Sequence, residues 1–108
     1  MAHVLLDLNN PVFQQDWLAL EHDDALAVLA TLKKIQKLDW GQLYGDRGLR
    51  WEAILSKTGH AGRRIYSLRV TRSMRAVAYR DGEFLRFLCS MPITIPLIDD
   101  SPAPRAPW

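Results

Sequence analysis

Residues 63–90, RRIYSLRVTRSMRAVAYRDGEFLRFLCS, place the strongest constraint on how this chain can fold. Two stretches of this segment alternate between apolar and polar residues, as β-strands do because successive side chains point to opposite faces of a sheet. Asp81 and Gly82 separate the second stretch from a third, largely apolar one, and an aspartate-glycine pair favours a two-residue hairpin loop. The segment therefore predicts three successive antiparallel strands, the last of them covered on both faces.

The alternation also predicts which side chains share a face of the sheet. Ser67 and Arg69 point to one face of the first strand, and Arg75, Val77 and Tyr79 point to one face of the second. Because the turn between these strands is short, Arg69 and Arg75 can lie together on one face. The spacing alone leaves the pairing register open.

The residues before this segment predict one strand and two helices. Residues 4–8 form a short apolar run, and Asn10 then offers a helix cap with Pro11 at the first helical position. A second helix is predicted to start at the acidic residues 21–24. Its apolar residues recur at helical spacing: Leu26, Leu29, Leu32 and Ile35.

The rest of the chain completes the predicted fold. Residues 39–50 contain three glycines and predict a loose connection, and residues 51–55 predict a further strand. The fold class is therefore α+β: two N-terminal helices packed on a small antiparallel sheet, in the order β-α-α-β-β-β. A chain of 108 residues predicts one domain, here residues 1–90. Residues 91–108 are proline-rich and predict a tail without a strand or a long helix.

Charge is distributed unevenly along the chain, although the net charge is only +2. Residues 47–90 carry ten basic residues against three acidic ones, whereas residues 1–46 carry three against seven. A basic sheet of this kind favours a polyanionic partner such as nucleic acid. A single cysteine allows no disulfide within the chain and favours the reducing cytoplasm, and no run is apolar enough to predict a membrane span.

Two arginines are the candidate catalytic residues. Arg69 and Arg75 on one sheet face could bind a phosphate in bidentate fashion and stabilise the extra charge of a phosphorane during RNA cleavage. Solvated strand arginines are the simpler alternative. The other arginines of the segment lie at strand ends, turns and the last strand, and are predicted to contact RNA phosphates: Arg63, Arg64, Arg72, Arg80 and Arg86.

Other residue types offer less chemistry. The three histidines are far apart in sequence, so neither a metal site nor a cofactor is predicted. Cys89 lies in an apolar strand pattern and is predicted to be a small buried residue rather than a nucleophile. Trp40, Tyr44 and Trp51 could stack nucleic-acid bases, although core packing is the expected role of Trp51.

The order of these elements, together with YSLRVTRSMRAVAYRDGEFLRFL at residues 66–88, resembles the RelE/ParE superfamily of bacterial toxins. The resemblance implies a toxin of a type II toxin-antitoxin system that cleaves mRNA on the ribosome and is neutralised by a cognate antitoxin protein. It places Arg69 and Arg75 at the family's basic positions, and Ser67 where some members have a further basic residue. Family members also use a tyrosine near the C-terminus.

The tail departs from this pattern. Residues 91–98 read Met-Pro-Ile-Thr-Ile-Pro-Leu-Ile. Written as codons, preceded by a C and shifted by one base, the same stretch can encode His-Ala-Asp-His-Asp-Ser-Ala-Tyr, the polar, tyrosine-ended segment that the resemblance leads us to expect. We therefore hypothesise that residues from about Cys89 onward are a frameshifted tail, which would inactivate the nuclease. A natural, divergent tail is the alternative.

Two other functions fit the same residues. A ParE-like toxin of the same fold would inhibit gyrase and would need no acid or base at its C-terminal end. A small RNA-binding module without catalysis would use the same arginines for affinity alone, and replacing Arg69 or Arg75 with alanine would then weaken binding in a salt-dependent way.

Overall fold

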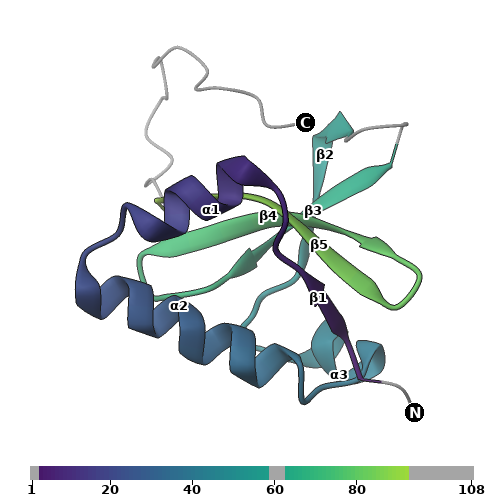
Figure 1. Ribbon diagram of the computed structural model, residues 1–108. Coiled ribbons are helices and arrows are strands. Elements are labelled where there is room, and N and C mark those ends of the chain that lie inside the picture. The colour runs from purple at the N-terminus through teal and green to yellow at the C-terminus, as the bar shows by residue number, and fades with distance from the viewer. Residues whose placement is uncertain (1–2, 59–62, 93–108) are drawn as a thin grey trace.

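In the part of the chain that the structure describes, five strands form one sheet in the order β1-β5-β4-β3-β2, with three helices packed against it (Figure 1). The structure, a computed structural model, describes residues 3–58 and 63–92. The fold is α+β, as predicted. Its elements are, in chain order, β1 (Leu5–Asp7), α1 (Pro11–Leu18), α2 (His22–Ile35), α3 (Trp40–Gly45), β2 (Glu52–Thr58), β3 (Arg64–Arg69), β4 (Met74–Asp81) and β5 (Phe84–Pro92).

The sheet is mixed rather than purely antiparallel. β2, β3, β4 and β5 pair antiparallel in sequence order, but β1 runs parallel to β5, with Leu5 opposite Phe84 and Asp7 opposite Arg86. The prediction of an antiparallel sheet was wrong on this point. An apolar run of three or four residues indicates a strand but carries no information about which distant strand it will join.

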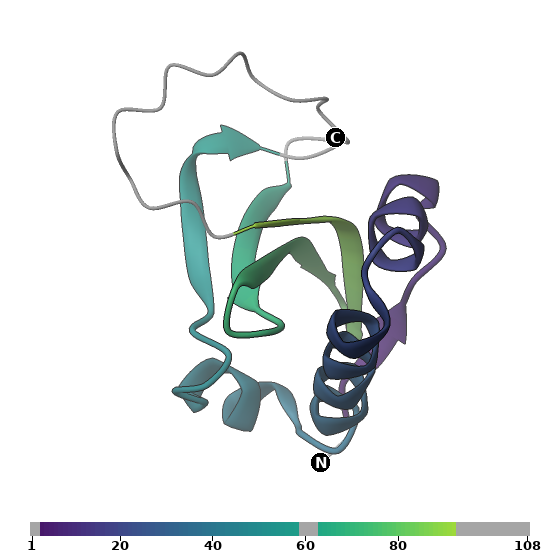
Figure 2. The ribbon, with the colours of Figure 1, turned by 90° about the vertical axis from the view of Figure 1, so that its left-hand side faces the viewer.

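Helices α1 and α2 lie on one face of the sheet (Figure 2). Phe13 of α1 is fully buried and packs on Phe87 of β5, with ring centroids 4.9 Å apart. The buried residues of α2 are Val28, Leu32 and Ile35. Burying such side chains against the sheet is the main force that holds the two layers together.

The predicted apolar stripe of α2 is only half correct. Leu32 and Ile35 are buried, but Leu26 and Leu29 are 50% and 38% exposed, and Val28 takes the core position instead. Both sets of residues fit steps of three and four along a helix. Only packing against the sheet decides which set faces inward, and the sequence pattern does not contain that information.

Local signals set the helix starts. The side chain of Asn10 accepts a hydrogen bond of 2.8 Å from the backbone N–H of Val12, and Pro11 opens α1, as predicted. Helix α3 was not predicted. It begins with a capping box in which Asp39 and Gln42 bond reciprocally to each other's backbone N–H. The helix is only six residues long and contains two glycines, so it gives little periodic signal.

The predicted hairpin joins β4 and β5, but its two-residue loop lies one residue further along the chain than predicted. Asp81 pairs with Phe84, so the two-residue loop is Gly82–Glu83. Gly82 has φ +62°, as the first central position of a type II′ turn requires, and glycine adopts this conformation without steric cost.

Strand β5 also continues beyond the predicted start of the tail. Met91 and Pro92 still pair with β4, opposite Arg75 and Met74, so the expectation of no strand after residue 90 was wrong for these two residues. Proline is tolerated there because it ends the strand, where its missing N–H costs least. The remainder of the tail, residues 93–108, lies outside the described residues.

Candidate functional site

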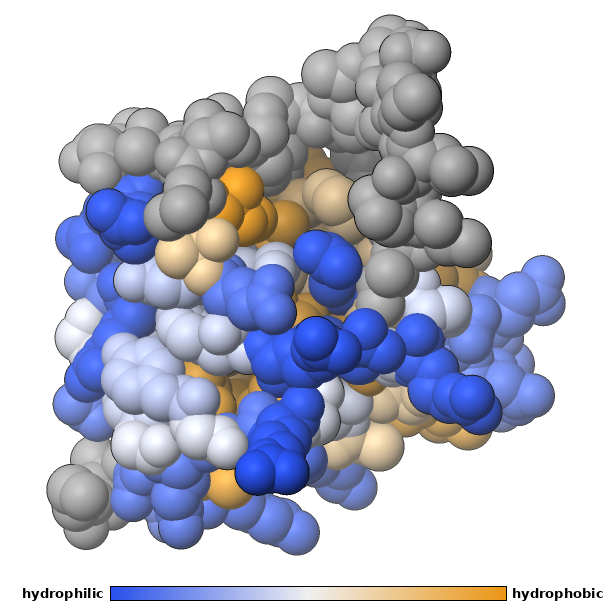
Figure 3. All heavy atoms as spheres, turned by 180° about the vertical axis from the view of Figure 1, so that it is seen from behind, coloured by the Kyte–Doolittle hydropathy of each residue, from blue (hydrophilic) through white to orange (hydrophobic). Residues whose placement is uncertain are grey.

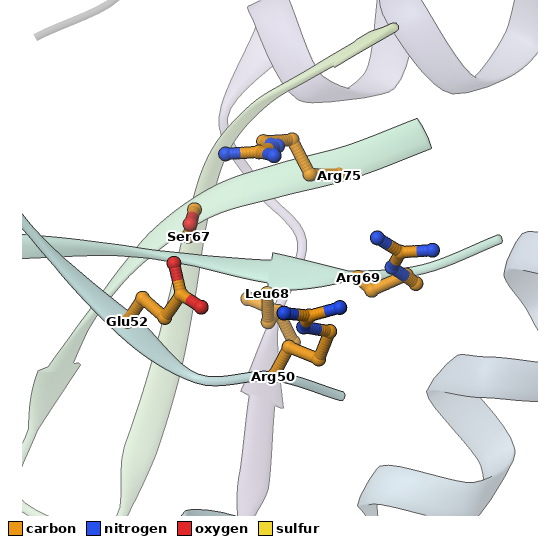
Figure 4. A pocket seen from close by; sticks show the side chains of 6 residues that line it. All are labelled: Arg50, Glu52, Ser67, Leu68, Arg69 and Arg75. Atoms are coloured by element: carbon orange, nitrogen blue, oxygen red, sulfur yellow. The ribbon is translucent and has the colours of Figure 1, made fainter. Parts of the chain in front are cut away.

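A small cleft of about 130 Å³ lies where β2, β3 and β4 meet the turn before β2. Six residues line it: Arg50, Glu52, Ser67, Leu68, Arg69 and Arg75 (Figure 4). Seen from behind, hydrophilic residues form a band across the middle of the molecule (Figure 3). Three arginines around one cleft favour an anionic ligand.

Arg69 and Arg75 stand directly opposite each other on β3 and β4. The prediction that they share a sheet face is therefore confirmed. Like charges at opposed positions destabilise an antiparallel pair, so this arrangement costs stability unless an anion lies between the guanidinium groups. An Nη of Arg69 lies 3.5 Å from the backbone carbonyl of Arg72, and Arg75 forms no ion pair with the residues that the structure describes.

Arg50 reaches the cleft through the turn that follows α3. The backbone N–H of Arg69 donates a hydrogen bond of 2.6 Å to the carbonyl of Leu49, which ties this turn to the end of β3. Leu49 itself is buried in the main core. Sequence reasoning missed Arg50 because nothing in the loop composition shows that its end lies beside β3.

The backbone of Arg50 is in the left-handed region, with φ +50°. A side chain with a Cβ pays roughly 1–2 kcal/mol for this conformation, and glycine or asparagine usually takes such a position. Strained backbone of this kind clusters at functional sites, so Arg50 joins Arg69 and Arg75 as a candidate.

We expect Arg50→Gly to be more stable than Arg50→Ala by about 1 kcal/mol, because only glycine adopts φ +50° without strain. This reverses the usual order of the two residues in helices and strands. Urea unfolding of both variants measures the difference, and both remove the same charge from the cleft. Equal stabilities, or a more stable alanine variant, would contradict a left-handed Arg50.

Asp46 holds the turn in place. Its carboxylate accepts hydrogen bonds of 3.0 Å from the backbone N–H of Leu49 and from Nζ of Lys34. The hydrogen bond from Lys34 is the main reason that the pKa of Asp46 lies below its ordinary value, while partial burial opposes the shift. A charged Asp46 therefore stabilises the folded state.

Asp46→Asn should lower the free energy of unfolding by ~0.5–1 kcal/mol at pH 7, since asparagine keeps an acceptor for Leu49 but loses the ion pair. Because the pKa of Asp46 is lower in the folded than in the unfolded protein, this stabilisation is present above the ordinary value of 3.8 and is lost as the pH falls through the folded pKa. Unfolding curves of wild type and variant should therefore converge in acid. With Lys34→Met as background, the substitution should have little effect at any pH.

Glu52 is the carboxylate of the cleft, and sequence reasoning missed it as well. It lies opposite Ser67 in the β2–β3 pairing, and Figure 4 shows its carboxylate directed toward Ser67. A group that can accept a proton therefore lies within the arginine cleft. The signal that could have found it is its isolation, since residues 47–90 hold only two other acids, Asp81 and Glu83.

Three of the predicted RNA-contacting arginines are engaged elsewhere. Arg86 bonds to Asp7 and, through Nε at 2.9 Å, to Asp81, which ties β1 to the β4–β5 hairpin. Arg63 pairs with Asp81 at 3.4 Å. Arg80 donates to the Tyr44 hydroxyl at 2.8 Å. These three arginines therefore lie outside the candidate site.

The other two arginines predicted to contact RNA are free of such contacts among the described residues. Arg64 and Arg72 are exposed, and neither forms an ion pair with any residue that the structure describes. They remain predicted phosphate contacts outside the cleft.

The described residues hold no cluster of three histidine, cysteine, aspartate or glutamate side chains that could bind a metal ion. Cys89 is 2% exposed, and burial raises the pKa of its thiol to about 11, which confirms it as a buried residue that stays protonated at neutral pH. Among the residues described, no helix is long and apolar enough to cross a bilayer.

Comparison with known proteins gives little further information. No family model matches the sequence. A search of curated proteins finds no match either. A crystal structure of a copper-bound mutant toxin from Helicobacter pylori is similar in fold, with a TM-score of 0.45 and 15% sequence identity over 86% of this chain and 96% of that one. A likeness of this degree assigns no function, so the proposal below stands on the cleft.

Proposed function

We propose that this chain is a toxin of a type II toxin-antitoxin system and that its cleft binds and cleaves mRNA on the ribosome. The observation that carries the proposal is the convergence of Arg50, Arg69 and Arg75 around Glu52 in one cleft. Three guanidinium groups suit a phosphodiester, and a carboxylate among them suits the transfer of a proton during its cleavage. The RelE-like order of strands and basic positions in the sequence adds to this support.

The proposed reaction uses the RNA's own 2′-hydroxyl. Glu52 accepts the hydroxyl proton, and the 2′-oxygen attacks the adjacent phosphorus. The extra negative charge of the pentacoordinate phosphorane is stabilised by Arg69 and Arg75, with Arg50 at the rim. The bond to the 5′-oxygen then breaks, which leaves a 2′,3′-cyclic phosphate and a 5′-hydroxyl.

The leaving 5′-oxygen must gain a proton, and here the tail matters. Residues 91–108 contain neither tyrosine nor histidine. In this chain the proton would come from water, so we expect slow cleavage. The frame-restored sequence would place histidines and a tyrosine at the end of β5 and beyond it, and we expect it to cleave faster, since a positioned acid typically contributes about 10²–10⁴-fold.

The proposal includes a protein partner. Residues 47–90 carry ten basic residues against three acidic ones, and a toxin with this surface suits an antitoxin segment of acidic character. Such a segment would neutralise the toxin by occupying the arginine cleft or the surface around it.

The test is a reconstituted translation system to which this chain or its frame-restored version is added. We expect mRNA cut within the ribosomal A site, slowly by this chain and faster by the restored protein, with cyclic phosphate ends. RNA binding without cleavage by either protein would instead support the non-catalytic RNA-binding module. If the restored protein neither binds RNA nor inhibits translation but blocks gyrase, the ParE-like alternative is correct.

A further inference from the structure

A second hollow, of about 460 Å³, adjoins the arginine cleft. The two share Arg50 and Glu52, and the aromatic lining of the second hollow comes from Tyr44 and Trp51. We propose that this hollow is a nucleobase subsite, which holds the base of the nucleotide next to the phosphate bound in the cleft. The inference rests on the proposed function, since it gives the cleft its substrate class: single-stranded RNA.

The aromatic wall is built as a rigid platform. Trp51 stacks on Tyr66 of β3, with ring centroids 4.4 Å apart and planes 19° from parallel. Tyr44 packs against Trp51 and Trp40, at 5.8 Å and 5.6 Å. Rings held in this way lose little entropy when a ligand binds, so their contact area converts efficiently into affinity.

Arg80 fixes the exposed ring of this platform. Its guanidinium group lies 4.4 Å from the ring centre of Trp40 and donates a hydrogen bond of 2.8 Å to the hydroxyl of Tyr44. Tyr44 is nevertheless 48% exposed, whereas Trp40 is 5% exposed and belongs to the core. Of the aromatic residues predicted to stack bases, Tyr44 is therefore the one that combines a fixed ring with open surface.

The chemistry around the hollow suits a base attached to a phosphate. Arg47 and Arg50 line the hollow and add positive charge to it. Every base has a π face, so stacking on Tyr44 adds affinity with little sequence preference. A base can lie on the ring only when it is free of a duplex, which selects single-stranded RNA.

The test uses a short single-stranded RNA with a 2′-O-methyl group at each nucleotide to block cleavage, and a set of copies in which one base at a time is removed to leave an abasic ribose. Fluorescence anisotropy measures the affinity of each RNA for the wild-type protein, Tyr44→Ala and Tyr44→Phe. We expect one position at which base removal weakens wild-type binding about tenfold or more. Tyr44→Ala should bind even the intact RNA more weakly than wild type by this same factor, and base removal at that position should weaken its binding no further. Tyr44→Phe should keep most of the affinity that the base contributes.

The outcomes separate this inference from the proposed function. If base removal weakens binding by the same factor in Tyr44→Ala and wild type, the base does not lie on Tyr44 and the subsite is wrong. Arg75→Ala, measured on the fully abasic RNA, reports on the phosphate cleft alone. If Arg75→Ala leaves that binding unchanged, the proposed function fails, whatever the bases do.

Discussion

Arg75→Ala is expected to weaken the binding of single-stranded RNA by about 10- to 100-fold, because charge-assisted hydrogen bonds to a phosphate contribute ~1.5–3 kcal/mol. Arg75 is the arginine of the cleft that faces Arg69 across β3 and β4. Its loss leaves a bound phosphate without one of its two central partners. Anisotropy titrations at several salt concentrations measure the effect, and the slope of affinity against salt should fall by about one phosphate contact.

The same substitution should make the protein slightly more stable. Arg69 and Arg75 are like charges at directly opposed positions, and removing one relieves a repulsion of ~0.2–1 kcal/mol. A loss of binding together with a gain in resistance to urea is the pattern of a functional residue. It excludes the explanation that the variant binds poorly because it is unfolded.

Arg64→Ala is the matched control, since it removes the same charge from an exposed arginine at the start of β3. Its affinity for RNA should fall only by the contribution of one non-specific phosphate contact, and its stability should not increase. If Arg64→Ala and Arg75→Ala weaken binding equally, the arginine surface acts as a whole and the cleft has no special role.

Glu52→Gln should have the largest effect on cleavage, a loss of about 10²–10⁴-fold measured in the frame-restored protein, because glutamine cannot accept the 2′-hydroxyl proton. RNA binding should change in the opposite direction. Removing a negative charge from a cleft with three arginines should tighten binding about fivefold, since a neighbouring unit charge is worth ~1 kcal/mol in water. Single-turnover cleavage and anisotropy report the two effects separately.

Glu83→Gln is the control for charge alone. Glu83 lies in the β4–β5 loop with its side chain 49% exposed, away from the residues that line the cleft. Its cleavage rate should stay close to that of the unsubstituted protein. If Glu52→Gln cleaves as fast as this control, the cleft has another base or none, and the proposed role of Glu52 is wrong.

Signals carried by neighbouring residues were enough to predict much of the fold. The cap at Asn10, the glycine at position 82 and the alternation around Arg69 each specify local geometry, and the structure places all three as expected, apart from a one-residue shift of the hairpin loop. Local sequence works here because each of these features depends only on residues a few positions away.

The site depends on contacts that no local pattern contains. Arg50 belongs to the cleft because the carbonyl of Leu49 bonds to the backbone of Arg69, and Glu52 belongs to it because β2 pairs beside Ser67. In sequence Arg86 resembles any other basic strand residue, but in the fold it bonds to Asp7, from the far end of the chain. An arginine's partners, and hence its freedom to bind RNA, are set by tertiary structure.

The pairing of β1 with β5 has a consequence for how the protein is made. Leu5 leaves the ribosome early but must wait for Phe84 before its strand can join the sheet. Contacts so distant in sequence form slowly, whereas the neighbouring strands β3 and β4 can meet soon after synthesis. Their opposed arginines repel each other, so we expect the cleft to be held firmly only after β5 has docked on β4. If the chain cleaves ribosome-bound mRNA as proposed, it would then become active only after most of it has left the ribosome that made it.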